Sequence, residues 1–113
     1  MVKLLKSDAT FSQDLTAGAL SFTTSYDKPF KLEQITLKAT VNITETVTIT
    51  VDSANGATYD VVLRKVNLSA EQDVVFRPEG EANFKKGDEI KVQCTNANTT
   101  GTVNGAVKAS ELN

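Results

Sequence analysis

The stretch ITLKATVNITETVTITV, residues Ile35 to Val51, decides the fold because apolar and polar side chains alternate through almost all of it. Its odd positions are apolar except for Glu45, and its even positions hold only Thr, Lys and Asn. A period of two is the pattern of a β-strand with one buried face. The β-branched residues that dominate the run also pack better on a pleated sheet than on a helix. The stretch therefore predicts β structure and excludes a helix.

One strand cannot contain the whole stretch. Its seventeen residues, at about 3.3 Å each, would span roughly 56 Å, about twice the width of a domain of this size. The chain must therefore bend or fold back between Asn42 and Glu45. In a direct hairpin, the loop has an odd length and residues such as Val41 and Val47 lie opposite each other. Alternatively, the two halves lie in opposite sheets of a sandwich and both point their odd residues inward.

The alternation changes phase just before this stretch. Residues Leu20 to Tyr26 carry their larger side chains at even positions and predict a strand. The next strand opens with Phe30 and Leu32, also at even positions, whereas the apolar set is odd from Ile35 onward. One residue near Glu33 and Gln34 must be absorbed, so we predict a β-bulge there.

A hairpin follows the stretch at Asn55-Gly56, a pair typical of tight turns. A two-residue turn would set Val51 opposite Asp60 and so place a core residue against a solvent residue. A five-residue loop over residues 53–57 instead sets Val51 opposite Tyr59 and keeps the faces together. We therefore expect the longer loop.

The rest of the chain shows the same short strands and turns. Near the N-terminus, residues 11–15 read as irregular. We expect further strands at 58–66 and 73–77. Another strand should follow a Gly87-Asp88 turn, with Ile90, Val92 and Cys94 facing inward, and a last strand should cover 103–109. In the last of these, Asn104-Gly105 could form a tight turn instead. About eight strands without a strong helix signal predict an all-β fold, a two-sheet antiparallel β-sandwich resembling a jelly roll, with a barrel as the alternative.

Composition limits the domain count, partners and location. The 113 residues form a single domain, 1–113, in which residues 1–10 are an N-terminal arm or an edge strand. The 12 basic and 14 acidic residues give a net charge of −2, which does not suit nucleic acid. The single cysteine, Cys94, excludes an intramolecular disulfide and favours folding in the cytoplasm. The start, MVKLLKSDATF, has too few apolar residues for a signal peptide, and no run is long enough to span a membrane.

The residues that usually carry chemistry are few. The chain has no histidine, which removes the usual general base and the commonest metal ligand. Cys94 shares the phase of its apolar neighbours and is expected to be a buried thiol. The acidic residues with turn-like surroundings match no calcium-binding loop, and these are Glu79, Glu81, Asp88 and Glu89. We expect no enzyme activity, no catalytic residues, no metal and no cofactor.

Aromatic and threonine side chains are the remaining candidates for a surface. There is no Trp, and Tyr26 and Tyr59 are in phase with apolar neighbours. The phenylalanines are expected in the core rather than as a stacking platform, and these are Phe11, Phe22, Phe30, Phe76 and Phe84. The threonines at even positions from Thr36 to Thr50 would form one uncharged face, which is either a solvated strand face or a flat surface laid against a partner.

Two segments resemble strands of a jelly roll. The early strands are matched by Phe30–Leu37, followed by the strand Val47–Val51, and the penultimate strand is matched by Phe84–Val92. With the small size and the Thr, Asn and Val bias, the chain resembles the small decoration, or cement, proteins of tailed-bacteriophage capsids. This resemblance implies a non-enzymatic virion structural protein, made in the host cytoplasm and then located on the outer capsid surface. It implies a homodimer or homotrimer that binds the major capsid protein and stabilises the shell, with no nucleic acid or membrane as partner.

On this hypothesis, three regions are candidates for partner binding. The N-terminal segment could add a strand to a partner's sheet, two loops could contact the shell, and the threonine face could lie against it. The residues are Val2, Leu4 and Leu5 in the segment, Asn55 and Asn98 in the loops, and Thr46, Thr48 and Thr50 on the face. Two alternatives remain: a jelly-roll module that binds a carbohydrate or a cell-surface polymer, and a phage head-fibre or tail component.

Overall fold

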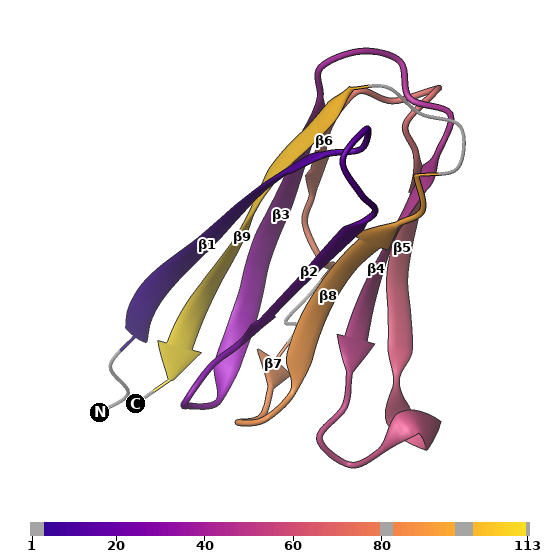
Figure 1. The fold of residues 1–113 in the computed structure, drawn as a ribbon. Helices are drawn as coiled ribbons and strands as arrows, with labels where there is room; N and C mark the ends of the chain where they lie inside the picture. Colours follow the sequence, from indigo (N-terminus) through magenta and orange to yellow (C-terminus); the bar gives the residue numbers. More distant parts are fainter. Residues whose placement is uncertain (1–3, 80–82, 97–100, 113) are drawn as a thin grey trace.

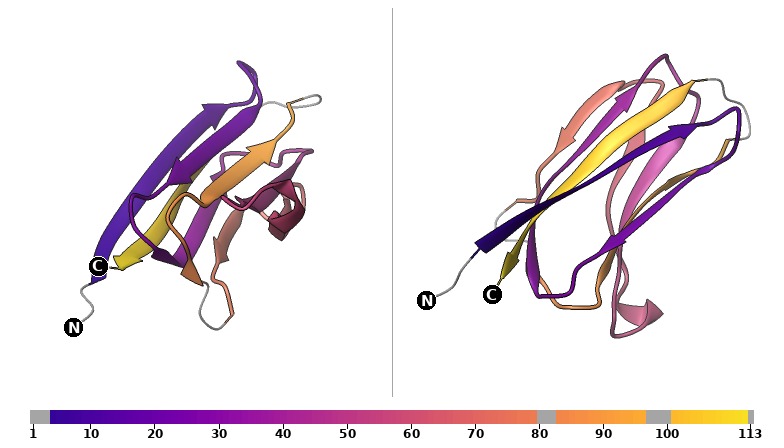
Figure 2. Two further views of the ribbon diagram at one scale, coloured as in Figure 1. Left: turned by 90° about the horizontal axis from the view of Figure 1, so that it is seen from below. Right: turned by 60° about the vertical axis from the view of Figure 1, so that its left-hand side comes forward.

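The computed structural model describes residues 4–79, 83–96 and 101–112, and within them the chain is all-β. Two antiparallel sheets pack face to face (Figures 1 and 2). The strands are β1 (Leu4–Asp14), β2 (Leu20–Ser25), β3 (Phe30–Ala39), β4 (Thr46–Asp52), β5 (Val61–Asn67), β6 (Asp73–Phe76), β7 (Asn83–Phe84), β8 (Glu89–Cys94) and β9 (Thr102–Leu112). A single turn of 3₁₀ helix, η1 (Ala57–Tyr59), precedes β5. The predicted β-sandwich is confirmed.

The order of the strands is that of a jelly roll. The first sheet runs β1-β9-β3-β6, with β7 also paired to β3, and the second runs β2-β8-β4-β5. Apart from the two-residue β7, the pairs are nested: β1 with β9, β2 with β8, β3 with β6 and β4 with β5. The chain is thus one long antiparallel hairpin, rolled so that β3 also pairs with β9 and β4 with β8.

The stretch from Ile35 to Val51 crosses from one sheet to the other. Strand β3 ends at Ala39 in the first sheet and β4 begins at Thr46 in the second. Of the two predicted arrangements, the one with opposite sheets is therefore correct. The odd residues of both halves meet in the core, and Ile35 and Ile49 are both 0% exposed. Val41 is the exception, because it lies in the crossing loop and is 45% exposed.

The predicted change of phase is also present. The pairing of β3 with β9 shifts between Leu32 and Gln34, so the β-bulge is confirmed. The bulge allows Leu32 and Ile35, three positions apart, to point into the same core. Without it, one of the two would face solvent.

The hairpin between β4 and β5 differs from the prediction. The connection covers residues 53–60 and includes η1, so the five-residue loop over 53–57 is wrong. Val51 pairs with Val61 rather than with Tyr59, which is 62% exposed. Further from the loop, a register irregularity between Ile49 and Thr50 sets Ile49 opposite Arg64, which breaks the rule that opposite residues keep one parity.

Strand β1 is longer than expected. The segment 11–15 was expected to be irregular, but β1 continues to Asp14 and pairs with β9 in an uninterrupted register. Its inner positions, Ala9, Phe11 and Gln13, are half-buried and include only one large apolar side chain, so the alternation is faint. The alternative tight turn at Asn104-Gly105 is wrong, since Gly105 lies in the middle of β9.

Aromatic side chains fill the core and its margins. Phe30 is buried, and the other four phenylalanines are partly buried against the core. Phe11 of β1 stacks on Phe22 of β2, with ring centroids 4.7 Å apart, and so joins the two sheets. The ring centroids of Tyr26 and Phe30 are 4.4 Å apart, and those of Phe30 and Phe84 are 5.5 Å apart. Of the two tyrosines expected in phase with the core, only Tyr26 is buried.

A buried carboxylate ties two loops together. Asp88, 7% exposed, accepts hydrogen bonds from the backbone N–H of Ala54 at 2.9 Å and of Lys85 at 3.1 Å. These contacts fasten the connection between β4 and β5 to the turn before β8. The predicted Gly87-Asp88 turn is present, and Gly87 adopts a φ of 95° that favours glycine.

Gly105 is required by close packing. A Cβ at this position would lie 2.3 Å from Cζ of Phe11 and 2.6 Å from the backbone oxygen of Thr36. We predict that Gly105→Ala lowers the free energy of unfolding by about 1–3 kcal/mol, measured by urea denaturation. Gly18→Ala is the control, because its Cβ would meet only Nε2 of Gln13 at 3.8 Å. Equal stability of the two variants would contradict this packing.

Asp88 provides a second test. We predict that Asp88→Ala lowers the free energy of unfolding by about 1–3 kcal/mol, because two backbone N–H groups lose their acceptor. Asp88→Asn keeps one acceptor oxygen and should lose less. If chemical denaturation finds the alanine variant as stable as the wild type, Asp88 does not hold these loops.

Candidate functional site

The outward side of the second sheet presents a four-strand surface, here named the polar face. The strand register places two consecutive rows of side chains across it: Ser21, Gln93, Thr48 and Lys65, then Thr23, Lys91, Thr50 and Val62. Five of these eight side chains are uncharged hydroxyls or amides. The pattern follows from the alternation, because the apolar residues between them point into the core. Most side chains of the polar face are therefore polar and uncharged.

One of the two lysines in these rows, Lys91, is held in an ion pair. Nζ of Lys91 lies 2.8 Å from the Asp52 carboxylate. The hydrogen bond from Lys91 lowers the pKa of Asp52 below its ordinary value, and the same contact raises the pKa of Lys91. Both groups therefore stay charged near neutral pH, and their net contribution to the face is close to zero.

A groove with a volume of about 900 Å³ opens at one end of the polar face. Hydroxyl and amide side chains from separate segments line it, among them Ser21, Thr48, Ser69 and Gln93. Leu20 and Cys94 contribute apolar surface. Within the described residues, its only carboxylate is that of Glu45. The groove thus combines neutral polar walls with one acidic group.

Glu45 is buried at the start of β4. Its side chain is 8% exposed, and the hydroxyl of Thr95 donates to its carboxylate, at 2.8 Å to Oε1 and 3.2 Å to Oε2. Its backbone oxygen accepts from the N–H of Leu68 at 3.0 Å. Across the described part of the chain, no Lys or Arg nitrogen lies within 4 Å of this carboxylate. Glu45 was visible in the sequence as the one polar residue at an odd position, although no role was assigned to it.

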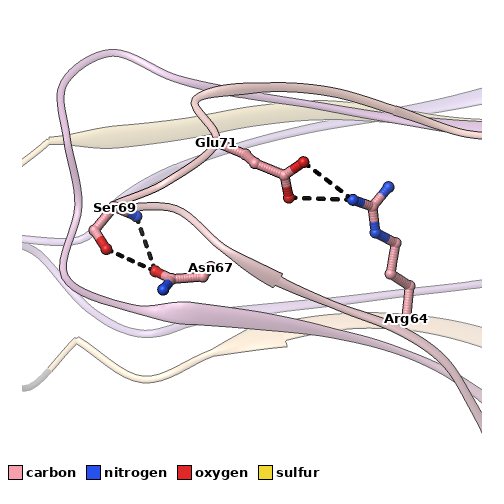
Figure 3. A network of polar contacts seen from close by, with 4 residues as sticks. All are labelled: Arg64, Asn67, Ser69 and Glu71. Atoms are coloured by element: carbon pink, nitrogen blue, oxygen red, sulfur yellow. Dashed lines mark hydrogen bonds and ion pairs between the residues drawn. The ribbon is translucent and has the colours of Figure 1, made fainter.

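Asn67 and Ser69, in the turn that follows β5, line one rim of the groove. Figure 3 shows the polar contacts of this turn. Oδ1 of Asn67 accepts from the backbone N–H of Ser69 at 3.0 Å and from its hydroxyl at 2.8 Å. Nη2 of Arg64 donates to both oxygens of Glu71, at 3.1 and 3.2 Å. These contacts hold the rim in place and leave the Arg64 guanidinium already paired.

Cys94 is buried, as predicted, and is a free thiol. Burial raises its pKa above the ordinary value. The thiol therefore stays protonated at neutral pH and is a poor nucleophile. Its side chain contributes apolar surface to the lining of the groove.

The candidate partner-binding residues do not form one site. Thr46, Thr48 and Thr50 lie together on β4 in the polar face, whereas Thr36 faces outward from the other sheet. The threonines from 36 to 50 therefore do not make the single surface that was expected.

The other candidates are elsewhere. Asn55 is exposed at the far end of the second sheet, beside the start of β8, and accepts from Nζ of Lys85. Leu4 and Leu5 begin β1, at an edge of the first sheet (Figure 1). Val2 and Asn98 lie outside the described residues.

The residues described offer neither a metal-binding cluster nor a membrane-spanning helix. No group of three or more His, Cys, Asp or Glu side chains that could hold a metal ion is found there. Nor does this part of the chain contain a helix long and apolar enough to cross a membrane.

Comparison with known proteins gives similarity of structure only. No protein-family model matches the chain, and no curated protein sequence matches it. The nucleoplasmin-like N-terminal domain of Drosophila FKBP39 is similar, with 13% identity, a TM-score of 0.49 and coverage of 96% of this chain and 90% of that one. A chain of infectious bursal disease virus, Gx strain, is similar with 12% identity and a TM-score of 0.47. The match covers 98% of this chain and 32% of the viral one, so this chain spans about a third of that length.

Proposed function

We propose that this protein is a non-enzymatic virion structural protein, a decoration or cement protein that binds the outer surface of a capsid and stabilises it. The observation that carries the proposal is the polar face, with its rows of hydroxyl and amide side chains and the ion pair between Lys91 and Asp52. Such a face suits contact with another folded protein better than chemistry, because its polar groups can pair across an interface without burying net charge.

The size of the face supports attachment in many copies. Four strands spaced about 4.8 Å apart and about seven residues long cover roughly 400 Å². A standard protein interface buries about 800 Å² on each partner, so one copy would bind weakly through this face alone. A shell offers the same site many times, and a copy that bridges two subunits gains avidity from the second contact.

Each decorating copy would act as a clamp between neighbouring subunits of the major capsid protein. Separation of the subunits under internal pressure would then require loss of both contacts. The oligomer that this proposal favours is a homodimer or homotrimer, for which β1 offers an eleven-residue edge strand. The protein would be made in the host cytoplasm and end on the virion surface.

Two other functions rank lower. A carbohydrate-binding module is favoured by the hydroxyl and amide groups in the groove. However, none of the described residues that line the groove is aromatic, so they give a sugar ring no surface on which to stack. A glycan array would detect such binding. A head-fibre or tail component would use the same surfaces of this protein. Binding to fibres or tails rather than to the capsid shell would distinguish this function from decoration.

We predict that a charge on the polar face weakens capsid binding. Thr50→Lys should reduce co-sedimentation with undecorated capsids about tenfold, because a second ammonium group would be buried beside Lys91 without an anionic partner. Thr36→Lys is the matched control, since Thr36 is also a half-buried threonine but lies on the opposite sheet. Equal loss in both variants would exclude the polar face as the contact. Absence of wild-type binding, and of any gain in capsid heat resistance, would remove the proposed function.

Removal of residues 1–6 tests the N-terminal segment. The shortened chain keeps the β1–β9 pairs from Ser7 to Asp14. We therefore predict that it stays folded while binding to capsids weakens, measured by thermal unfolding and by co-sedimentation. A melting temperature that falls while binding is retained would assign the segment to the core of the domain instead.

A further inference from the structure

We propose that the groove at the end of the polar face binds a guanidinium group, the side chain of an arginine on the capsid subunit. The inference rests on the proposed function and names the chemistry of the contact. It starts from Glu45, whose carboxylate is buried and has a single neutral donor, the Thr95 hydroxyl, among the described residues.

The buried carboxylate of Glu45 has few compensating contacts among the described residues. A buried carboxylate is costly unless a cation or several hydrogen bonds compensate it. The Thr95 hydroxyl supplies one proton, whereas a carboxylate accepts about four hydrogen bonds. Asp88 shows the contrast, because two backbone N–H groups donate to its oxygens. Among the described residues, Glu45 therefore has no cation beside it, and its oxygens have acceptor capacity that the chain does not use.

The shape and lining of the groove select the ligand. A guanidinium donates two parallel hydrogen bonds to a carboxylate and has further N–H groups to spare. Thr48, Ser69 and Gln93 carry oxygens in the same lining that can accept these. Leu20 and Cys94 give the aliphatic stem of an arginine an apolar surface. A neutral sugar could use the oxygens but would leave the charge of Glu45 uncompensated.

The arginine is assigned to another protein rather than to a second copy of this chain. The sequence holds two arginines, Arg64 and Arg77. Arg64 donates to both oxygens of Glu71, and Nε of Arg77 donates to Gln34 at 3.2 Å. Both are therefore engaged within their own chain.

The direct test is an NMR titration of the full chain with Nα-acetyl-arginine amide at low salt. The side-chain amide of Gln93 should shift saturably, and the shift should weaken as salt is added. The citrulline analogue has the same length without the charge and should bind about tenfold more weakly. Equal binding of arginine and citrulline, or shifts caused by a methyl glycoside instead, would overturn the assignment.

Glu45→Gln is the matching variant. It keeps an oxygen for the Thr95 hydroxyl, so the fold should persist, but its affinity for the arginine probe should fall about tenfold. Glu79→Gln removes the same charge from the exposed segment after β6, outside the groove lining and the polar face, and should bind as the wild type does. If Glu45→Gln fails to fold, Thr48→Lys replaces it, because a lysine within the groove should pair with Glu45 and exclude the probe. Undiminished binding by the folded variant would contradict the inference.

Capsid binding separates this inference from the proposed function. Glu45→Gln should weaken co-sedimentation with undecorated capsids by a similar factor, and Glu79→Gln should not. Wild-type protein that binds the probe but no capsid would leave the groove assignment standing and remove the proposed function. The reverse, capsid binding unaffected by Glu45→Gln, would remove only the groove assignment. A change in oligomeric state on Glu45→Gln, seen by sedimentation velocity, would point to an arginine of a second copy and overturn the assignment to the capsid.

Discussion

Burial of one face of every strand is the constraint on which the rest of the structure depends. It is strongest in the stretch from Ile35 to Val51, whose two halves supply opposite walls of one core. Ile35 and Leu37 point inward from the first sheet, and Val47 and Ile49 point inward from the second. Because strands alternate, the same burial decides which side chains face solvent. The polar face is the outer side of that arrangement.

Two buried carboxylates at opposite ends of the second sheet serve different purposes. Asp88 accepts from two backbone N–H groups and joins loops that belong to its own chain. Glu45 also joins segments, through Thr95 and through its backbone contact with Leu68, but its charge is not matched by a cation among the described residues. The first therefore reads as a structural residue. The second combines a structural contact with the properties of a binding group.

Much of the fold could be predicted because the core strands carry a full alternation of large apolar residues. The same alternation revealed the bulge between Leu32 and Gln34, where it changes phase. Prediction failed where a strand has only one weakly apolar face, as in β1, and where a second bulge breaks parity, as between Ile49 and Thr50. The groove could not be predicted, because Leu20, Glu45, Ser69 and Gln93 come together only through the nested pairing of distant strands. For the same reason, the threonines of one sequence stretch are divided between two faces.

On the proposed function, the second sheet of the sandwich contacts the capsid and the first sheet does not. The polar face has rows of mostly uncharged side chains and a groove with one carboxylate, and its area is too small for tight binding by one copy. These properties together favour a shallow contact that is repeated over the shell. A cryo-electron microscopy reconstruction of a decorated capsid tests this most directly. We expect the second sheet to face the shell, with Thr48 and Gln93 in the interface and an arginine of the subunit beside Glu45. A reconstruction with the first sheet against the shell and the polar face open to solvent would contradict it.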